Sequence, residues 1–464
     1  MKRYFYPLAL VALLSCTTSS RPTATAPATP IVATLAAPVP TATPVVTEKA
    51  MVVSAHPAAT RVGVEILRRG GNAYDAAVAV QFALAVVFPV AGNLGGGGFL
   101  LYRGANGQEG ALDFRETAPA AASRDMYLDA QGNIIPDLST LGHRPVGVPG
   151  TVAGMVELHK KLGKLPWQDV VQPAVDLAAQ GVALTAKEAA GLNAYRNNFS
   201  RFTPTSSYLA AAGTDWKAGQ VIRHPDLART LERIRDQGRA GFYDGETANL
   251  LVAEMQRGQG LISKKDLQGY QPKWRTPLHG QYRGHHVLAF PPPSSGGVAL
   301  LQMLQMLEPY DLRKAGWHSP QATHWITEAE RRVYADRATY LGDPDFGKVP
   351  VAQLLDKAYN RRRMASTLPH RATPSAQVAA GPGLPGYESD QTTHYSVVDA
   401  QGNAVSCTTT LNGAYGSKVV VAGAGFILNN EMDDFSSKPG TPNAYGLVGA
   451  RPMPLPPASA CCRR

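Results

Sequence analysis

The chain has 464 residues, 44% of them hydrophobic, so it is long and apolar enough to form a large core. Lys and Arg number 45 against 35 Asp and Glu, and the resulting formal charge of +10 is spread thinly along the sequence. The densest basic run, Arg361–Arg363, is short and has no interleaved aromatic residues, so the charge pattern does not favour nucleic-acid binding and suits small anionic substrates as well.

The N-terminus, MKRYFYPLALVALLSC, combines a basic start with a short apolar run. The run is too short to span a bilayer and predicts an export signal over residues 1–16. The segment Leu13–Cys16 also resembles a bacterial lipobox, in which Cys16 would become a lipidated first residue; an ordinary secretory signal is the alternative. The predicted location is the bacterial periplasm, with membrane attachment only through a lipid anchor at Cys16.

Residues 17–48 are mostly Thr, Ala, Pro and Val and predict an extended tether, because they offer few large apolar groups to pack. The four cysteines are Cys16, Cys407, Cys461 and Cys462. Their spacing predicts neither a disulfide framework nor a zinc site. No residue pattern suggests a metal or an organic cofactor.

A globular region begins at Met51 with two predicted helices. The first stops at Gly70-Gly71, which is a C-terminal cap signal. The second starts at Asn72 or Asp75 and is almost wholly apolar as far as Phe88, which predicts a buried helix.

A glycine run, Gly95–Gly98, precedes a predicted strand with the sequence FLLYR. One interpretation is a turn with positive φ and tight packing. The other is a set of backbone amides that approach a ligand. The first is favoured on sequence alone, because the spacing is not that of a nucleotide-binding loop.

Further helices are expected over residues 151–162, 225–238 and 320–341, and further strands at ALDFRE and HHVLAF. The sequence FPPPSSGGVALLQMLQML predicts a rigid loop that caps a helix, with Ser294 or Ser295 as the N-cap. The segment 373–389 is rich in Ala, Gly, Pro and Ser, which predicts an exposed, mobile stretch accessible to proteases.

Arg115 is expected inside the apolar strand ALDFR. An arginine there is costly unless it meets an anion. A structural ion pair with Asp113 or Glu116 and a bound anionic substrate are equally compatible with the sequence.

The loop Ala400–Gly402, with glycine in third place, predicts a β-hairpin. It pairs Asp399 with Asn403, and the same register places Thr392 opposite Thr410, with Cβ atoms about 4.5–5.5 Å apart. A slip of one residue would remove this pairing.

Two facing hydroxyls suggest nucleophilic chemistry, although a threonine needs a neighbouring base. A cut before Thr392 would supply one, because the new α-amine has a pKa of about 7.7–8.0 in model peptides. This is the threonine variant of catalysis by an N-terminal nucleophile. An ordinary hairpin with threonine as a good strand former is the alternative, and the hairpin alone favours it.

The blocks MVVSAHPAAT, GGNAYDAAVAV, AGNLGGGGF, DFRETAP, GVPGTVAGM, FPPPSSGGVALLQML, EAERRVYADRATYLGDPDF, QTTHYSVVD, TLNGAYGS, GFILNNEMDDF and NAYGLVGA follow one another from Met51 to Ala450. In this order they resemble the γ-glutamyltranspeptidases, which are N-terminal nucleophile hydrolases. The resemblance implies an α/β fold, a four-layer αββα sandwich. It also implies a precursor that cleaves itself between Gln391 and Thr392, with a large-subunit region over 49–391 and a small-subunit region over 392–450.

The resemblance further implies the roles of the site residues. Thr392 would attack the γ-carbonyl of glutathione or another γ-glutamyl compound, assisted by Thr410, and water or an acceptor amino acid would resolve the γ-glutamyl-enzyme. The implied substrate-binding residues are Arg115, which would clamp the α-carboxylate; Asn412, Glu431 and Asp434, which would hold the α-amino and α-carboxyl ends; and Tyr445, in a lid over the pocket.

The resemblance ends after Ala450, where RPMPLPPASACCRR stands in place of EANAIAPGKR, a Ser-Ser pair and a later Gly-Gly pair. In the family these pairs contact the substrate carboxylate and form the oxyanion hole. One permitted set of codons for the tail, with a single G restored after the codon of Ala450, regroups to encode EANAIAPGKRLLSS. We therefore expect a one-base frameshift or sequencing error, an aberrant tail over 451–464 and a chain that is inactive or unstable as written, because losing one oxyanion donor costs about 10²–10³ in rate.

Two alternatives accompany the transpeptidase hypothesis. One is a related acylase acting on another amide, such as a β-lactam side chain, against which Arg115, Asn412 and Asp434 favour a glutamyl substrate. The other is a catalytically inactive, lipid-anchored envelope protein that only binds.

Overall fold

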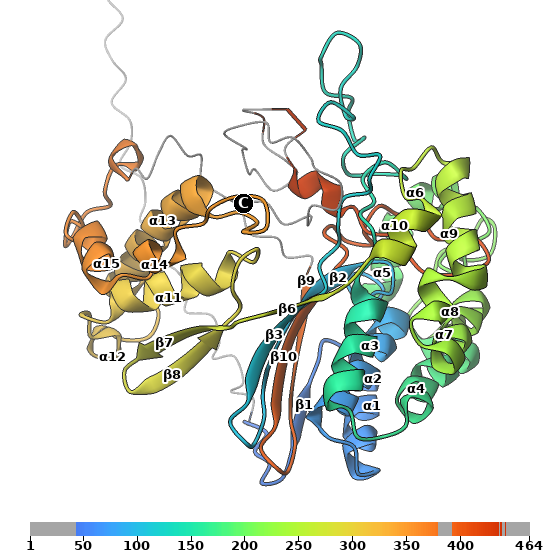
Figure 1. Ribbon diagram of the computed structural model, residues 1–464, viewed down its shortest axis with the longest axis horizontal. Coiled ribbons are helices and arrows are strands. Elements are labelled where there is room, and N and C mark those ends of the chain that lie inside the picture. The colour runs from blue at the N-terminus through green and yellow to red at the C-terminus, as the bar shows by residue number, and fades with distance from the viewer. Residues whose placement is uncertain (1–42, 379–391, 436, 439–440, 442–464) are drawn as a thin grey trace, which may run out of the picture. The chain divides into compact units, whose positions relative to one another are not determined.

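A six-stranded antiparallel sheet lies at the centre of the structure, which is a computed structural model (Figure 1). Its strands, in spatial order, are β1 (Met51–Val53), β9 (Thr392–Val398), β10 (Ala404–Thr410), β2 (Gly97–Arg103), β3 (Glu109–Asp113) and β6 (Lys273–Arg275). Among the described strands, the two that come last in the sequence, β9 and β10, therefore lie between strands from the first part of the chain.

The structure describes residues 43–378, 392–435, 437–438 and 441. The export signal, most of the tether, the cleavage-site residue Gln391, the lid residue Tyr445 and the tail 451–464 lie outside these residues, as does most of the segment 373–389. The described residues from Thr47 onward belong to one compact unit. Among the described helices, none is long and apolar enough to cross a membrane.

Helices cover one face of the sheet (Figure 1). The nearest are α1 (Pro57–Arg68), α2 (Ala73–Val87) and α3 (Thr151–Leu162), and α4 (Trp167–Gln180) packs against α2. Every residue of α2 is buried, as its sequence predicted, because α2 lies between the sheet and the neighbouring helices. Its first turn is fixed by a reciprocal capping box between Asn72 and Asp75.

The remaining elements on this side are α5 (Ala186–Ala194), α6 (Arg196–Phe202), α7 (Pro225–Gln237), α8 (Ala240–Tyr243), α9 (Gly245–Arg257), α10 (Lys264–Gly269) and the strand pair β4 (Val182–Ala183) and β5 (Val221–Ile222).

A second group of elements lies on the opposite side of the sheet (Figure 1). It consists of the hairpin β7 (Leu278–Tyr282) and β8 (His285–Ala289) and the helices α11 (Gly296–Leu307), α12 (Leu312–Ala315), α13 (Pro320–Tyr340), α14 (Val351–Leu354) and α15 (Lys357–Met364). Helix α11 packs on the hairpin and on α13. The expected helices over 151–162, 225–238 and 320–341 are confirmed as α3, α7 and α13.

The glycine run differs from its favoured interpretation in one respect. None of Gly95–Gly98 has a positive φ, and the last two residues open strand β2, so the predicted turn is wrong. The predicted tight packing is confirmed, because a Cβ added to Gly96 or Gly98 would lie 2.2 Å from a carbonyl oxygen of β10. The glycines thus allow the backbones of β2 and β10 to come into close contact.

The predicted register of the β9–β10 hairpin is confirmed. Asp399 donates its N–H to the carbonyl of Asn403 at 3.0 Å, and Gly402 has a φ of 89°. Thr392 lies directly opposite Thr410. Since side chains alternate along a strand and Tyr395 is buried in the core that the sheet shares with the helices, the two threonines point to the other face.

Candidate active site

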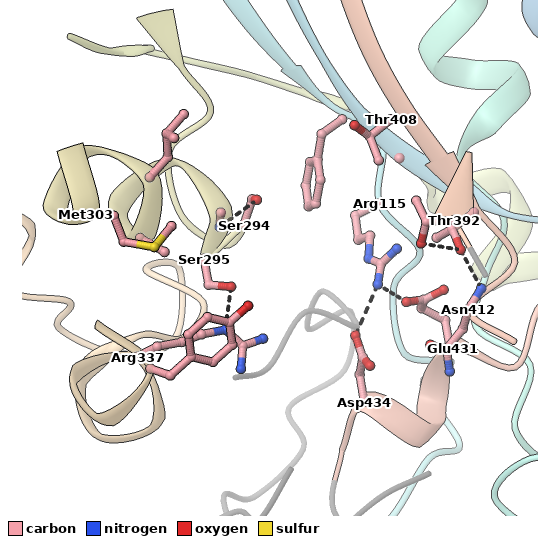
Figure 2. Close-up of a pocket in the computed structure, with 17 residues that line it drawn as sticks. Arg115, Ser294, Ser295, Met303, Arg337, Thr392, Thr408, Asn412, Glu431 and Asp434 are labelled. Atoms are coloured by element: carbon pink, nitrogen blue, oxygen red, sulfur yellow. Dashed lines mark hydrogen bonds and ion pairs between the residues drawn. The ribbon is translucent and has the colours of Figure 1, made fainter. Parts of the chain in front are cut away.

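The paired threonines lie at the end of the hairpin, on the face of the sheet turned away from α2. The Oγ1 atoms of Thr392 and Thr410 are 3.4 Å apart (Figure 2). Thr410 is 5% exposed and its Oγ1 accepts the backbone N–H of Asn412 at 2.9 Å, whereas Thr392 is exposed. One hydroxyl is therefore held in place, and the other is accessible to a substrate.

Asn412 turns the chain away from strand β10. Its φ is 72°, a left-handed conformation that asparagine tolerates better than most residues. Its side-chain amide donates to the carbonyl of Asn430 at 2.9 Å. Asn412 thus supports Thr410 through its backbone and ties the hairpin to the segment that leads into Glu431.

No imidazole or carboxylate within the described residues hydrogen-bonds to the Thr392 hydroxyl. The nearest candidate in sequence, His394, pairs through Nδ1 with Thr408 at 2.8 Å instead. Burial lowers the pKa of His394. Among the described residues, therefore, no side chain is positioned to act as the base in place of the α-amine of Thr392.

Arg115 lies two residues beyond the end of β3, which ends at Asp113 rather than continuing through the arginine as expected. Its Nη2 lies 3.0 Å from Asp434 and also contacts Glu431, both in the short 3-10 helix η2 (Glu431–Asp434) (Figure 2). The two ion-pair partners expected from sequence contribute less. The Glu116 carboxylate lies 3.8 Å from Arg115 Nη1, and Asp113 forms its ion pair with another arginine. Arg115, Glu431 and Asp434 are therefore brought together, as the resemblance implied.

The acidic helix η2 is held against the preceding loops by polar and apolar contacts. Asp433 accepts a hydrogen bond from the Ser139 hydroxyl at 2.6 Å, and the N–H of Met432 donates to the carbonyl of Pro145 at 3.1 Å. Met432 also packs with Ala118 and Tyr127 in a small buried cluster. These contacts fix the positions of the Glu431 and Asp434 carboxylates at the two ends of η2.

Burial sets the protonation behaviour of the acids around Arg115. It raises the pKa of Asp434 to about 6, although the positive charge of Arg115 opposes the shift. It also raises the pKa of Glu116 to about 7. One guanidinium facing several carboxylates suits a ligand that carries an anion and a cation on one carbon, as an α-amino acid does.

The threonine pair, Arg115 and Asp434 line a cavity of about 340 Å³, within the range of small-molecule sites of about 300–1,000 Å³. One wall holds Thr392, Thr410, Asn412, Arg115, Glu431 and Asp434. The other, formed by the start of α11 and by α13, holds Ser294, Ser295, Met303 and Arg337 (Figure 2). No group of three or more His, Cys, Asp or Glu residues in the described segments is arranged to hold a metal ion.

The second wall was not assigned to the site from sequence. Ser295 occupies the predicted N-cap of α11, but it makes no capping bond and accepts a hydrogen bond from Arg337 Nε at 2.8 Å. Ser294 accepts the N–H of Gly296 at 3.3 Å. The sequence signal that could have revealed this wall is the polar Ser294-Ser295 pair between a proline run and an apolar helix.

Known proteins similar in sequence point to one family. The family model described as Gamma-glutamyltranspeptidase matches residues 59–458. The Glutathione hydrolase proenzyme of Pseudomonas sp. (strain A14) is 47% identical over 406 residues, which cover 87% of this chain and 70% of that protein. The Acylase ACY 1 proenzyme of Pseudomonas sp. (strain V22) is 38% identical over 403 residues, which cover 86% and 71%.

A solved structure agrees with the sequence matches. The crystal structure of Helicobacter pylori gamma-glutamyltranspeptidase superposes with a TM-score of 0.71 at 42% identity, covering 75% of this chain and 100% of that chain. This likeness confirms the predicted fold class, the α/β sandwich of the N-terminal nucleophile hydrolases.

Proposed function

The chain belongs to the γ-glutamyltranspeptidase family, and we propose that it hydrolyses or transfers the γ-glutamyl group of glutathione and other γ-glutamyl compounds. The observation that carries the proposal is the Thr392–Thr410 pair at one end of a cavity that also contains Arg115 with Glu431 and Asp434. In this proposal the threonine pair supplies the nucleophile, and Arg115 with the two acids recognises the amino-acid part of the substrate.

The proposed chemistry begins with a cut between Gln391 and Thr392, which divides the precursor into two chains. The free α-amine of Thr392 then takes the hydroxyl proton as Oγ1 adds to the substrate γ-carbonyl. The carbon–nitrogen bond breaks, the leaving amine receives that proton, and a γ-glutamyl ester of Thr392 remains. Water or an acceptor amino acid attacks the ester, and Thr392 regains its proton. Thr410 holds the Thr392 hydroxyl in position for both steps.

Substrate recognition in this proposal uses the charges of the pocket. Arg115 binds the α-carboxylate of the glutamyl group through a planar guanidinium, which matches a carboxylate in shape. Glu431, Asp434 and Asn412 hold the α-amino and α-carboxyl ends of the glutamyl group.

An acylase activity is the second candidate, and the 38% identity to an acylase proenzyme supports it. The higher identity to a glutathione hydrolase proenzyme and the acidic pair beside Arg115 favour the γ-glutamyl substrate. A glutaryl amide, which lacks the α-amine, would be the better substrate of an acylase.

The test is to express the chain and follow both reactions. The proposal predicts two fragments on a denaturing gel, with Thr392 at the N-terminus of the smaller one, and much faster release of p-nitroaniline from γ-glutamyl-p-nitroanilide than from the glutaryl analogue. Thr392→Ala should show neither cleavage nor turnover. An intact wild-type chain without activity would contradict the proposal.

We also propose export to the bacterial periplasm with a lipid anchor at Cys16. The basic start, apolar run and lipobox-like sequence support it. Incorporation of labelled fatty acid into the wild-type chain, and its loss in Cys16→Ser, would be the expected result.

A further inference from the structure

The wall of the cavity across from the threonines carries a second arginine. Arg337 lies on α13 and lines the same cavity as Thr392, and Figure 2 shows it on the far side of the pocket from Thr392 and Asn412. Its Nε donates to the Ser295 hydroxyl at 2.8 Å, which orients the guanidinium. Its positive charge is also close enough to Asp434 to lower the pKa of that carboxyl, against the larger effect of burial.

The surroundings of Arg337 differ from those of Arg115. Arg115 has Glu431 and Asp434 as direct ion-pair partners on its own wall. Beside Arg337 the cavity is lined by the hydroxyl residues Ser294 and Ser295 and by the apolar side chains of Leu300 and Met303. A positive charge with hydroxyls and an apolar flank matches an amino acid or dipeptide that presents a carboxylate and a side chain.

Glutathione carries two carboxylates, and a single arginine can bind only one of them in a bidentate manner. The α-carboxylate of the glutamyl group is assigned to Arg115. The other belongs to the glycine end, which leaves with the cysteinylglycine when the amide is broken. In transfer, the amine of an acceptor amino acid attacks the γ-glutamyl ester, which is the reverse of the step in which cysteinylglycine leaves. The leaving group and the acceptor therefore occupy the same part of the site.

We propose that Arg337, positioned by Ser295, binds the carboxylate of the leaving peptide and of the acceptor amino acid, so that the wall formed by α11 and α13 determines the specificity for both. The proposal rests on the proposed function and concerns the half of the cavity that does not contact the glutamyl group. It follows that substrates whose leaving group has no carboxylate depend less on Arg337.

The test compares glutathione with glutathione amide, in which only the glycine carboxylate is neutralised. Binding to the cleaved wild-type protein is measured by competition, as the initial-rate inhibition constants of the two ligands against γ-glutamyl-p-nitroanilide. We expect glutathione to bind about 10- to 100-fold more tightly than the amide, as for loss of one hydrogen-bonded charged contact. In Arg337→Gln the two ligands should bind equally, because the contact that distinguishes them is lost.

Activity provides the second measurement. Arg337→Gln should lower kcat/KM for glutathione and raise the KM for glycylglycine as acceptor by about the same factor, and it should lower kcat/KM for γ-glutamyl-p-nitroanilide by a smaller factor. Arg337→Lys should recover part of the loss. Arg313→Gln, which removes an exposed charge from α12 outside the cavity, is the matched control and should behave as wild type.

Two results would overturn the proposal. One is an unchanged preference for glutathione over its amide in Arg337→Gln. The other is an equal loss with both ligands, which would assign Arg337 to the glutamyl half or to structure alone. If neither ligand binds and γ-glutamyl-p-nitroanilide is not hydrolysed by the wild-type chain, the proposed function fails together with this inference, and the wild-type assay alone identifies that case.

Discussion

Thr410 lies directly opposite Thr392 in the β9–β10 hairpin, and the two hydroxyl oxygens are 3.4 Å apart. The partner hydroxyl is in turn held by the backbone N–H of Asn412 at 2.9 Å. The pair is therefore a fixed hydroxyl beside an exposed one, and the first prediction follows from that asymmetry.

Replacing Thr410 should impair the reaction while the substrate still binds. We expect Thr410→Ala to lower kcat by about 10- to 100-fold with little change in KM, the effect of losing one hydrogen bond to the reacting group. Thr410→Ser should retain most activity. Thr409→Val is the control, because Thr409 donates to the carbonyl of Gly97 and its hydroxyl accepts from Asn93, so it should lower stability rather than kcat.

The carboxylate of Asp434 should matter only for substrates that carry an α-amine. Asp434→Asn should lower kcat/KM for γ-glutamyl-p-nitroanilide by about tenfold or more, because the ammonium group loses a charged partner. The residual rate with glutaryl-p-nitroanilide should not fall. Equal losses with both substrates would show that Asp434 acts by holding Arg115, with which it pairs at 3.0 Å.

The acid side of the pH profile should contain two ionisations. The α-amine of Thr392 must be unprotonated and titrates at about 7.7–8.0 in model peptides, while burial raises the pKa of Asp434 to about 6. A plot of log kcat/KM against pH should therefore have a slope near 1 below pH of about 7.7, steepening towards 2 below about 6. In Asp434→Asn the slope should stay near 1 throughout.

Glu116 should make stability fall as pH rises. Burial raises its pKa in the folded chain from the ordinary 4.5 to about 7, so between these values the folded state binds more protons than the unfolded state. The contribution of Glu116 is then largest below pH 4.5 and is lost as pH rises through about 7, by up to about 3 kcal/mol. Between pH 4.5 and 7.5, Glu116→Gln should lose less stability in urea unfolding than the wild type does.

The contact between β2 and β10 should not tolerate a side chain. Gly98→Ala places a Cβ 2.2 Å from the Thr408 carbonyl oxygen, which forces the strands apart and should cost about 1–3 kcal/mol or prevent folding. Gly269→Ala is the matched control, since no atom lies within 4 Å of its added Cβ, and it should be neutral or slightly stabilising. Similar losses in both variants would contradict the packing argument.

The sequence predicted those parts of the site that depend on local geometry. The three-residue turn fixes the hairpin register, and with it the Thr392–Thr410 pair, because side chains in a hairpin are placed by counting from the turn. The contact of Arg115 with Glu431 and Asp434 joins distant segments, so spacing could not reveal it and only the family resemblance did.

The wall containing Arg337 shows what sequence reasoning could not reach. The sequence predicts Ser294 or Ser295 as the cap of α11, since a serine before an apolar helix usually caps it, but the hydroxyl of Ser295 at the N-cap binds a side chain from another helix. The glycine run showed a related limit, because Gly98 resembles a turn residue in sequence yet lies in a strand against a neighbouring backbone. Both outcomes depend on tertiary neighbours.

The position of the β9–β10 hairpin between β1 and β2 has a consequence for the order of events during synthesis. A ribosome completes α2 and β2 long before it reaches Thr392, and until then the apolar surfaces that will contact Tyr395 and Val397 have no cover. The middle of the sheet is thus the last part to be made, and folding must be largely post-translational. After a cut before Thr392, the two products would remain joined by strand pairing on both sides of the hairpin. Neither product should refold when separated from the other.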